Sequence, residues 1–108
     1  MESTIEKVNE TVVLTIQYEA LDAKSAKTFR QEFEQIREDG TQILLDLSNV
    51  EFVDSAGLGA IVAELKSLRS TGGDMKICNV HKTVRALFEL VRMHRLVDIF
   101  NNREEALA

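Results

Sequence analysis

The side chains most suited to chemistry lie in one short segment, Asp54–Gly59, which reads Asp-Ser-Ala-Gly-Leu-Gly. The segment follows strand-like residues and opens a helical pattern, and open α/β sheets usually bind their ligands at such a junction. A hydroxyl at a helix start can cap free backbone N–H groups, and a phosphate there would face the same donors and the positive end of the helix dipole. The small residues around Ser55 leave its backbone accessible to another protein. Ser55 is therefore the candidate site of phosphorylation.

Each polar residue near this junction also has a simpler interpretation. A serine at a helix start is, on local chemistry alone, most often an ordinary cap without modification. Asp54 either helps to position a loop that faces a kinase or caps the same helix. Asp22 either contacts a partner or caps an earlier helix, and capping is the favoured role for both aspartates.

Other arrangements that could support catalysis are incomplete. Cys78 and His81 have Cys-x-x-His spacing, but a structural zinc site needs about four ligands, so core packing is the better prediction for Cys78. His81 and His94 belong to no recognisable catalytic triad and are expected at the surface. No Walker loop or dinucleotide fingerprint is present. An enzyme built on Asp54 and Ser55 is therefore the weaker alternative, and neither a metal nor a cofactor is predicted.

The residue pattern predicts the frame that positions Ser55. β-branched residues indicate strands over about residues 4–8 and 11–17. A helix is expected over residues 23–37, with Asp22 as its cap and Asp39-Gly40 at its end. The later elements are a buried strand at 43–47, a helix from Asp54 to Gly72-Gly73, a strand at 75–80, a helix around 84–91, a strand at 96–100 and a terminal helix that begins at Asn101-Asn102.

This order of strands and helices predicts one α/β domain over residues 1–108, with a largely parallel sheet and right-handed crossovers. Apolar residues at helical spacing are expected to form its core rather than a ligand pocket. They are Phe29, Phe33, Leu58, Ile61, Val62, Leu65, Leu87 and Phe88.

Composition narrows the class of partner. The 108 residues carry a net charge of −5, which argues against general binding to nucleic acid or to anionic membranes. Up to Asp54 there are 5 basic and 12 acidic residues, and from Ser55 onward 8 basic and 6 acidic. A protein that meets the N-terminal half should therefore be basic. Lys82, Arg85, Arg92 and Arg95 could form a basic face, although a solvated helix face is the favoured interpretation.

The cellular compartment is predicted from the number of cysteines and from the N-terminal residues. Cys78 is the only cysteine, so no disulfide within the chain is possible. The N-terminus begins with acidic and polar residues, and no apolar run approaches the ~20 residues that span a bilayer. A cytoplasmic protein without membrane insertion is expected.

The segment Asp54–Gly59, preceded by Ile43–Val50, resembles the signature of the STAS-domain anti-sigma-factor antagonists. The resemblance covers nearly the whole chain and includes Leu21-Asp22, Gly72-Gly73 and Val84–Leu90. It implies a STAS domain, in which a mixed, mostly parallel sheet is joined by crossover helices.

The resemblance also implies a phosphorylation switch. An anti-sigma factor with serine-kinase activity would phosphorylate Ser55, using its own ATP and magnesium, and a serine phosphatase would restore the hydroxyl. The unphosphorylated form would bind the anti-sigma factor and release a sigma factor to regulate transcription. The alternative is a constitutive scaffold or adaptor subunit of a sensory or transport complex. The implied partner-binding residues are Asp22, Asp54, Ser55, Ala56, Gly57, Leu58 and Gly59.

Three departures from the family pattern bear on specificity. Glu19-Ala20 stands before Leu21-Asp22 where Gly-Glu is common, and Ala56 replaces the serine or threonine that often follows the phosphoacceptor. Val91-Arg92-Met93 stands where Thr-Gly-Leu is common. These changes leave Ser55 in place and concern the identity of the partner.

Overall fold

A computed structural model describes residues 3–108, in which strands and helices alternate along the chain. The strands are β1 (Thr4–Val8), β2 (Thr11–Thr15), β3 (Ala20–Leu21), β4 (Gln42–Asp46), β5 (Phe52–Val53), β6 (Asp74–Cys78) and β7 (Asp98–Phe100). The helices are α1 (Ala26–Ile36), α2 (Ser55–Ser70), α3 (Lys82–Leu90), the short 3₁₀ helix η1 (Met93–Arg95) and α4 (Arg103–Leu107). Within residues 3–108, no helix is both long enough and apolar enough to cross a membrane.

The main sheet has the strand order β1-β2-β4-β6-β7. Only β1 and β2 pair antiparallel, and every other neighbouring pair in this sheet is parallel. The predicted α/β class with a mixed, mostly parallel sheet is therefore confirmed. A separate parallel pair, β3 with β5, was not predicted from the sequence.

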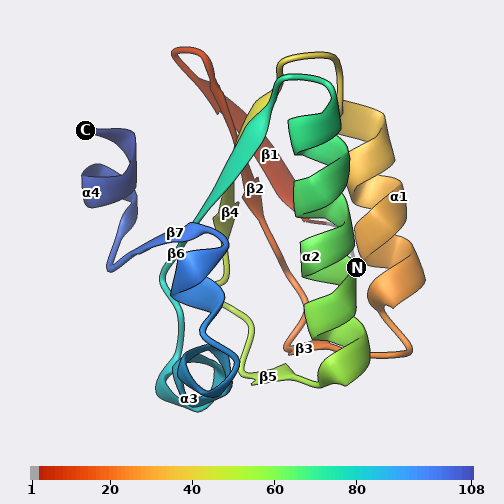
Figure 1. Cartoon of the computed structure of the whole chain (residues 1–108), viewed down its shortest axis with the longest axis vertical. Helices are drawn as coiled ribbons and strands as arrows, with labels where there is room; N and C mark the ends of the chain where they lie inside the picture. The colour runs from red at the N-terminus through yellow and green to blue at the C-terminus, as the bar shows by residue number, and fades with distance from the viewer. Residues whose placement is uncertain (1–2) are drawn as a thin grey trace.

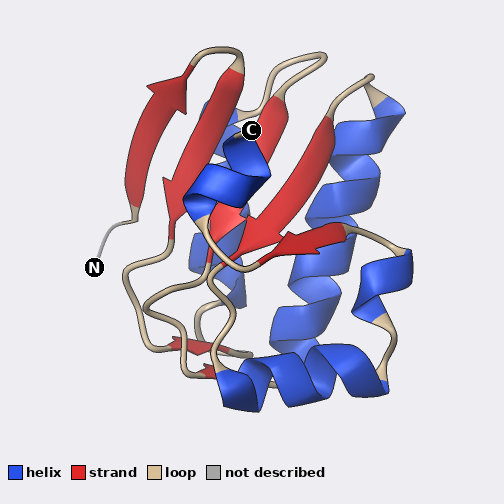
Figure 2. Cartoon of the chain, turned by 90° about the vertical axis from the view of Figure 1, so that its left-hand side faces the viewer, coloured by secondary structure: helices blue, strands red, loops and turns tan. Residues whose placement is uncertain are grey.

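Helices cover the two faces of the sheet unequally. Helices α1 and α2 pack side by side over one face, α4 lies on the other, and α3 lies below the lower ends of the strands (Figure 1). The turned view shows the same three layers, with the short α4 in front of the sheet (Figure 2). The main core fills the space under α1 and α2, where the rings of Phe29 and Phe33 lie 4.8 Å apart.

A smaller apolar cluster lies under α4. Ala106 packs there with Val13, Leu44 and Cys78, which point to that face from β2, β4 and β6. Arg103 Nη2 bonds to Glu6 Oε1 at 3.0 Å, so α4 is also tied to the edge strand β1. This second face is therefore closed by only five helical residues.

Helix α1 differs from its predicted bounds at both ends. It begins at Ala26, and Asp22 lies in the preceding turn, where its Oδ1 accepts hydrogen bonds from the N–H groups of Lys24 and Ser25. The Ser25 hydroxyl donates to the Ala20 carbonyl oxygen at 2.8 Å, which holds this turn against β3. The helix ends at Ile36, and Gly40 adopts a left-handed φ of 79° in the later turn.

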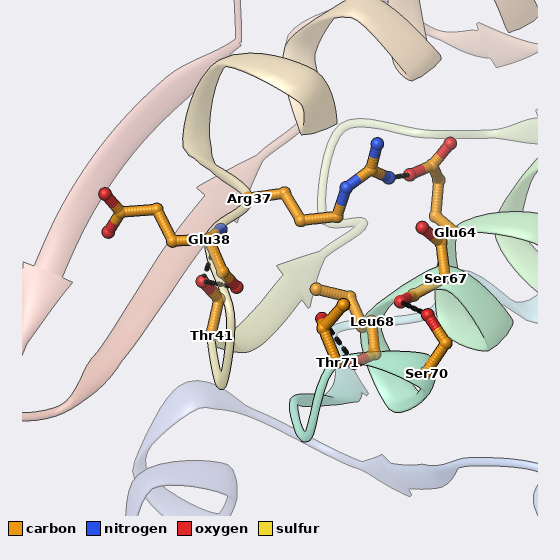
Figure 3. A network of polar contacts seen from close by, with 8 residues as sticks. All are labelled: Arg37, Glu38, Thr41, Glu64, Ser67, Leu68, Ser70 and Thr71. Atoms are coloured by element: carbon orange, nitrogen blue, oxygen red, sulfur yellow. Dashed lines mark hydrogen bonds and ion pairs between the residues drawn. The ribbon is translucent and has the colours of Figure 1, made fainter.

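An ion pair with a buried carboxylate joins the end of α1 to α2. Arg37, which follows α1, pairs with Glu64 on the inner side of α2 (Figure 3). Burial raises the pKa of the Glu64 carboxyl, and the positive charge of Arg37 only partly offsets that effect. Glu64 shares its helix stripe with Ile61, Leu65 and Leu68, so the pair replaces what would otherwise be an apolar contact.

Candidate functional site

Asp54 caps the N-terminus of α2. Its backbone is extended (φ −103°, ψ −173°), and its Oδ1 accepts a hydrogen bond from the N–H of Gly57 at 2.9 Å. The N–H of Leu58 donates to the Asp54 carbonyl oxygen at 2.9 Å, which starts the helical ladder. The interpretation of Asp54 as a helix cap is therefore confirmed, and that of Ser55 as the cap is wrong.

Ser55 is the first residue of α2, and its side chain is exposed. Because Asp54 supplies the cap, the Ser55 hydroxyl forms no hydrogen bond within residues 3–108. The N–H groups of the first turn precede the helical ladder, so they and the helix dipole form a partial positive charge beside this hydroxyl. The hydroxyl is thus free to react and lies next to a region that favours an anion.

Gly57 is buried, whereas Ser55, Ala56 and Gly59 are exposed and Leu58 is half-buried. A Cβ at this position would lie 1.9 Å from the Leu21 carbonyl oxygen, because α2 starts directly against β3. The sequence-based expectation that Gly57 leaves the backbone open to a partner is therefore wrong: the close approach is made by the chain itself. Gly59 has open space on its outer side, as predicted.

The small sheet brings the Asp22 turn to the Ser55 segment. Leu21 pairs with Val53 in parallel, so the next residues, Asp22 and Asp54, leave paired strands at the same end. The Asp54 N–H donates to the Leu21 carbonyl oxygen at 3.3 Å, which links the two chain segments just before α2. Asp22 and Asp54 are both half-buried. The Asp22 turn and the Asp54–Ser55 junction thus follow directly on β3 and β5. These two strands lie at one end of the molecule, beside the start of α2 (Figure 1).

Phe52 is an exposed aromatic residue that sequence reasoning missed. Its side chain is 55% exposed on β5, while the neighbouring Val53 is buried. The Thr83 hydroxyl donates to the Glu51 carbonyl oxygen at 2.8 Å, so α3 starts beside this strand. Successive side chains of a strand point to opposite faces, so Phe52 and Val53 could not both face the core. This alternation was the signal available in the sequence.

Cys78 and His81 do not form a metal site. Cys78 is fully buried in the cluster under α4, as predicted, and burial raises the pKa of its thiol to about 12. The His81 ring is exposed and its Nε2 contacts the Ser48 carbonyl oxygen. Within residues 3–108, no three His, Cys, Asp or Glu side chains are grouped to hold a metal ion.

The family model of the STAS domain matches residues 2–106, which is almost the whole chain. The chain belongs to the STAS domain family. The match covers the Asp54–Gly59 segment together with the strands and helices around it.

Two relatives are named as anti-sigma-factor antagonists. A Thermotoga neapolitana protein, provisionally named an anti-sigma factor antagonist, is 34% identical over 94% of this chain and 91% of its own length. The anti-sigma-B factor antagonist of Bacillus subtilis is 29% identical over 73% of this chain and 72% of its own length.

A solved structure shows the same fold. The crystal structure of a Thermotoga maritima protein, provisionally named an anti-sigma factor antagonist, is 30% identical and superposes with a TM-score of 0.85. The superposition covers 97% of this chain and 91% of that one. The STAS sheet and its helices are therefore shared by the two proteins.

Proposed function

We propose that this STAS domain is an anti-sigma-factor antagonist that is switched by phosphorylation of Ser55. The observation that carries the proposal is the free, exposed Ser55 hydroxyl at the start of α2, beside an aspartate that already caps the helix. The names of relatives that align over most of the chain support the partner class.

In this proposal the phosphate acts locally. It adds about −1.5 to −2 charges and three acceptor oxygens, which the first N–H groups of α2 can stabilise without unfolding the helix. A partner that covers Ser55 would have to desolvate this phosphate and accept its bulk next to the Asp54 carboxylate. A penalty of ~3 kcal/mol would weaken binding by roughly two orders of magnitude, which is enough for a switch.

The proposed docking surface centres on Ser55. It adds the exposed ring of Phe52, which can anchor a partner because aromatic side chains often dominate interface energies. Gly57 supports the surface from inside and is not part of it. The remaining members of the surface are Asp22, Asp54, Ala56, Leu58 and Gly59.

The proposed partners complete a cycle in the cytoplasm. An anti-sigma factor with serine-kinase activity binds the unphosphorylated form and releases its sigma factor, and it also transfers phosphate from ATP to Ser55. A serine phosphatase then restores the hydroxyl. The chain itself acts by binding and needs no catalytic residue of its own.

The test uses the wild-type protein and three variants as baits in native cell extract, combined with phosphosite mapping of the endogenous chain. Ser55→Asp mimics the charge, and Ser55→Ala keeps the surface uncharged. Ser70→Asp is the matched control, because Ser70 is exposed at the opposite end of the same helix. Thermal melting of each variant checks that all four proteins are folded.

The proposal predicts that an anti-sigma factor is captured by the wild type, Ser55→Ala and Ser70→Asp, and is lost with Ser55→Asp. Phosphate should map to Ser55. Capture of the same complex by all four baits, with Ser55 unmodified in cells, would contradict the switch and favour a constitutive scaffold.

A further inference from the structure

Exposed apolar side chains gather at the C-terminal end of α3. Within residues 3–108 five large hydrophobic side chains are exposed, and three of them, Leu90, Val91 and Leu96, lie around the turn from α3 to η1. Leu90 is 80% exposed, more than any of the others. Contiguous exposed apolar side chains on a soluble domain often mark an interaction site. We call this region the α3–η1 surface and define it as Arg85, Leu90, Val91, Arg92, His94, Arg95 and Leu96.

A hollow of about 290 Å³ lies beside these residues, between α3, η1 and β7. Its floor is apolar and is formed by Val80, Phe88 and Ile99. Arg85, His94 and Glu89 line it as well, and Arg85 is only half-buried. The hollow therefore offers apolar surface to an inserted side chain, with the guanidinium group of Arg85, the ring of His94 and the carboxylate of Glu89 beside it.

Unpaired positive charge surrounds the apolar side chains. The ion pairs within residues 3–108 join Arg37, Arg69 and Arg103 to their carboxylates, and none involves Arg85, Arg92 or Arg95. Glu89 is the one acidic residue between Lys82 and Leu96. Because the whole chain has a net charge of −5, this local excess of arginine is not a reflection of composition. The complementary surface must be acidic.

The backbone holds one of these cations in a costly conformation. Arg92 has a left-handed φ of 57°, which is unfavourable for a residue with a side chain. Residues retained in such conformations concentrate at ligand-binding sites and switch regions. The turn exposes both Val91 and Arg92 to solvent.

We propose that the α3–η1 surface binds an acidic segment of a partner protein, which inserts an apolar side chain into the hollow and places carboxylates against the arginines. The charge and the apolar floor together select this occupant. The surface is separate from the Ser55 site: α3 begins at the Thr83–Glu51 contact and its nine residues carry the chain about 13 Å away. This inference is independent of the proposed function.

The probe is a synthetic amphipathic peptide with leucine at every third or fourth position and glutamate elsewhere, labelled for fluorescence anisotropy. A second peptide with lysine in place of glutamate is its control. The acidic peptide should bind the full chain, and rising salt should weaken binding because the charges are exposed. The basic peptide should not bind.

Matched variants locate the contact. Leu90→Ser and Arg92→Glu/Arg95→Glu should each weaken peptide binding at least tenfold. Their controls are Ile5→Ser and Lys7→Glu, which change an exposed aliphatic and an exposed basic residue on the edge strand β1 and should leave binding unchanged. Ser55→Asp should also leave it unchanged. Circular dichroism of each variant checks folding, and NMR shift mapping should place the peptide on residues 85–96.

Several outcomes would overturn the proposal. They are no saturable binding of the acidic peptide below about 1 mM, equal losses in the β1 variants, and shift changes centred on residues 52–58. Binding of vesicles with anionic lipid that is lost in the Leu90 and arginine variants, without binding of the peptide, would assign the surface to membranes instead. Self-association in analytical ultracentrifugation that Leu90→Ser abolishes, without peptide binding, would assign it to a second copy.

Discussion

Gly57 lies so close to Leu21 that a Cβ on the glycine would stand 1.9 Å from the leucine carbonyl oxygen. This contact brings the start of α2 onto the end of β3. It therefore fixes the position of Ser55, two residues earlier, relative to the Asp22 turn, one residue after Leu21. A packing contact inside the domain thus sets the geometry of the exposed segment.

The first prediction concerns this contact. Gly57→Ala should lower the free energy of unfolding by about 1–3 kcal/mol, because either α2 or β3 must move. Gly59→Ala is its matched control: the position is helical and has open space, so alanine should raise stability by roughly 0.5–1 kcal/mol. Urea denaturation of both variants gives the comparison. Equal stability of Gly57→Ala and wild type would show that the close approach is not rigid.

The second prediction separates the cap from the proposed interface. Asp54→Ala should cost about 1 kcal/mol of stability, because the Gly57 N–H loses its acceptor. Asp54→Asn keeps an acceptor oxygen and should stay close to wild type. If Asp54→Asn is stable but no longer binds the partner, the partner recognises the carboxylate itself. Full binding by this variant would limit Asp54 to capping.

The third prediction concerns pH. Because burial raises the folded-state pKa of Glu64, its ionisation costs stability at neutral pH and that cost disappears as the pH falls below the folded-state value. The free energy of unfolding of wild type should therefore rise relative to that of Glu64→Gln between pH 7 and about pH 4. Denaturation of both proteins across this range tests it. A constant difference would mean that Arg37 fully compensates for burial.

The fourth prediction concerns Cys78. With the thiol buried and its pKa raised to about 12, almost no reactive thiolate exists at neutral pH. Iodoacetamide should leave the native protein unlabelled and should label it fully in denaturant, as read by intact-mass spectrometry. Rapid labelling under native conditions would indicate that α4 opens frequently.

The order of the elements and the class of the fold could be predicted because the patterns involved are local. Apolar periodicity located α1, α2 and α3, a capping pattern located α4, and the run Ile43–Leu47 located the central strand β4. The β3–β5 pair escaped because two-residue strands have no measurable period. Missing this pair concealed part of the site, because the pairing of β3 with β5 brings Asp22 and Asp54 to the same end of the two strands.

Parts of the site could not be predicted because they depend on contacts between distant residues. In the sequence alone, a glycine suggests a flexible or accessible position. Only the fold shows that Leu21 occupies the space beside Gly57. Because Glu64 carries a charge, the sequence suggests an exposed side chain. Its ion pair with Arg37 allows the carboxylate to be buried. For the helix start, either Asp54 or Ser55 satisfied the residue preferences, and the backbone conformation decides between them.

The ion pair between Arg103 and Glu6 joins side chains that are 97 positions apart in the sequence. Residues 103–107 follow every strand that they cover. A chain interrupted before residue 103 would lack the helix that packs on Val13, Leu44 and Cys78, and that face of the sheet would be open to water. Such an uncovered apolar sheet face favours aggregation and recognition by chaperones.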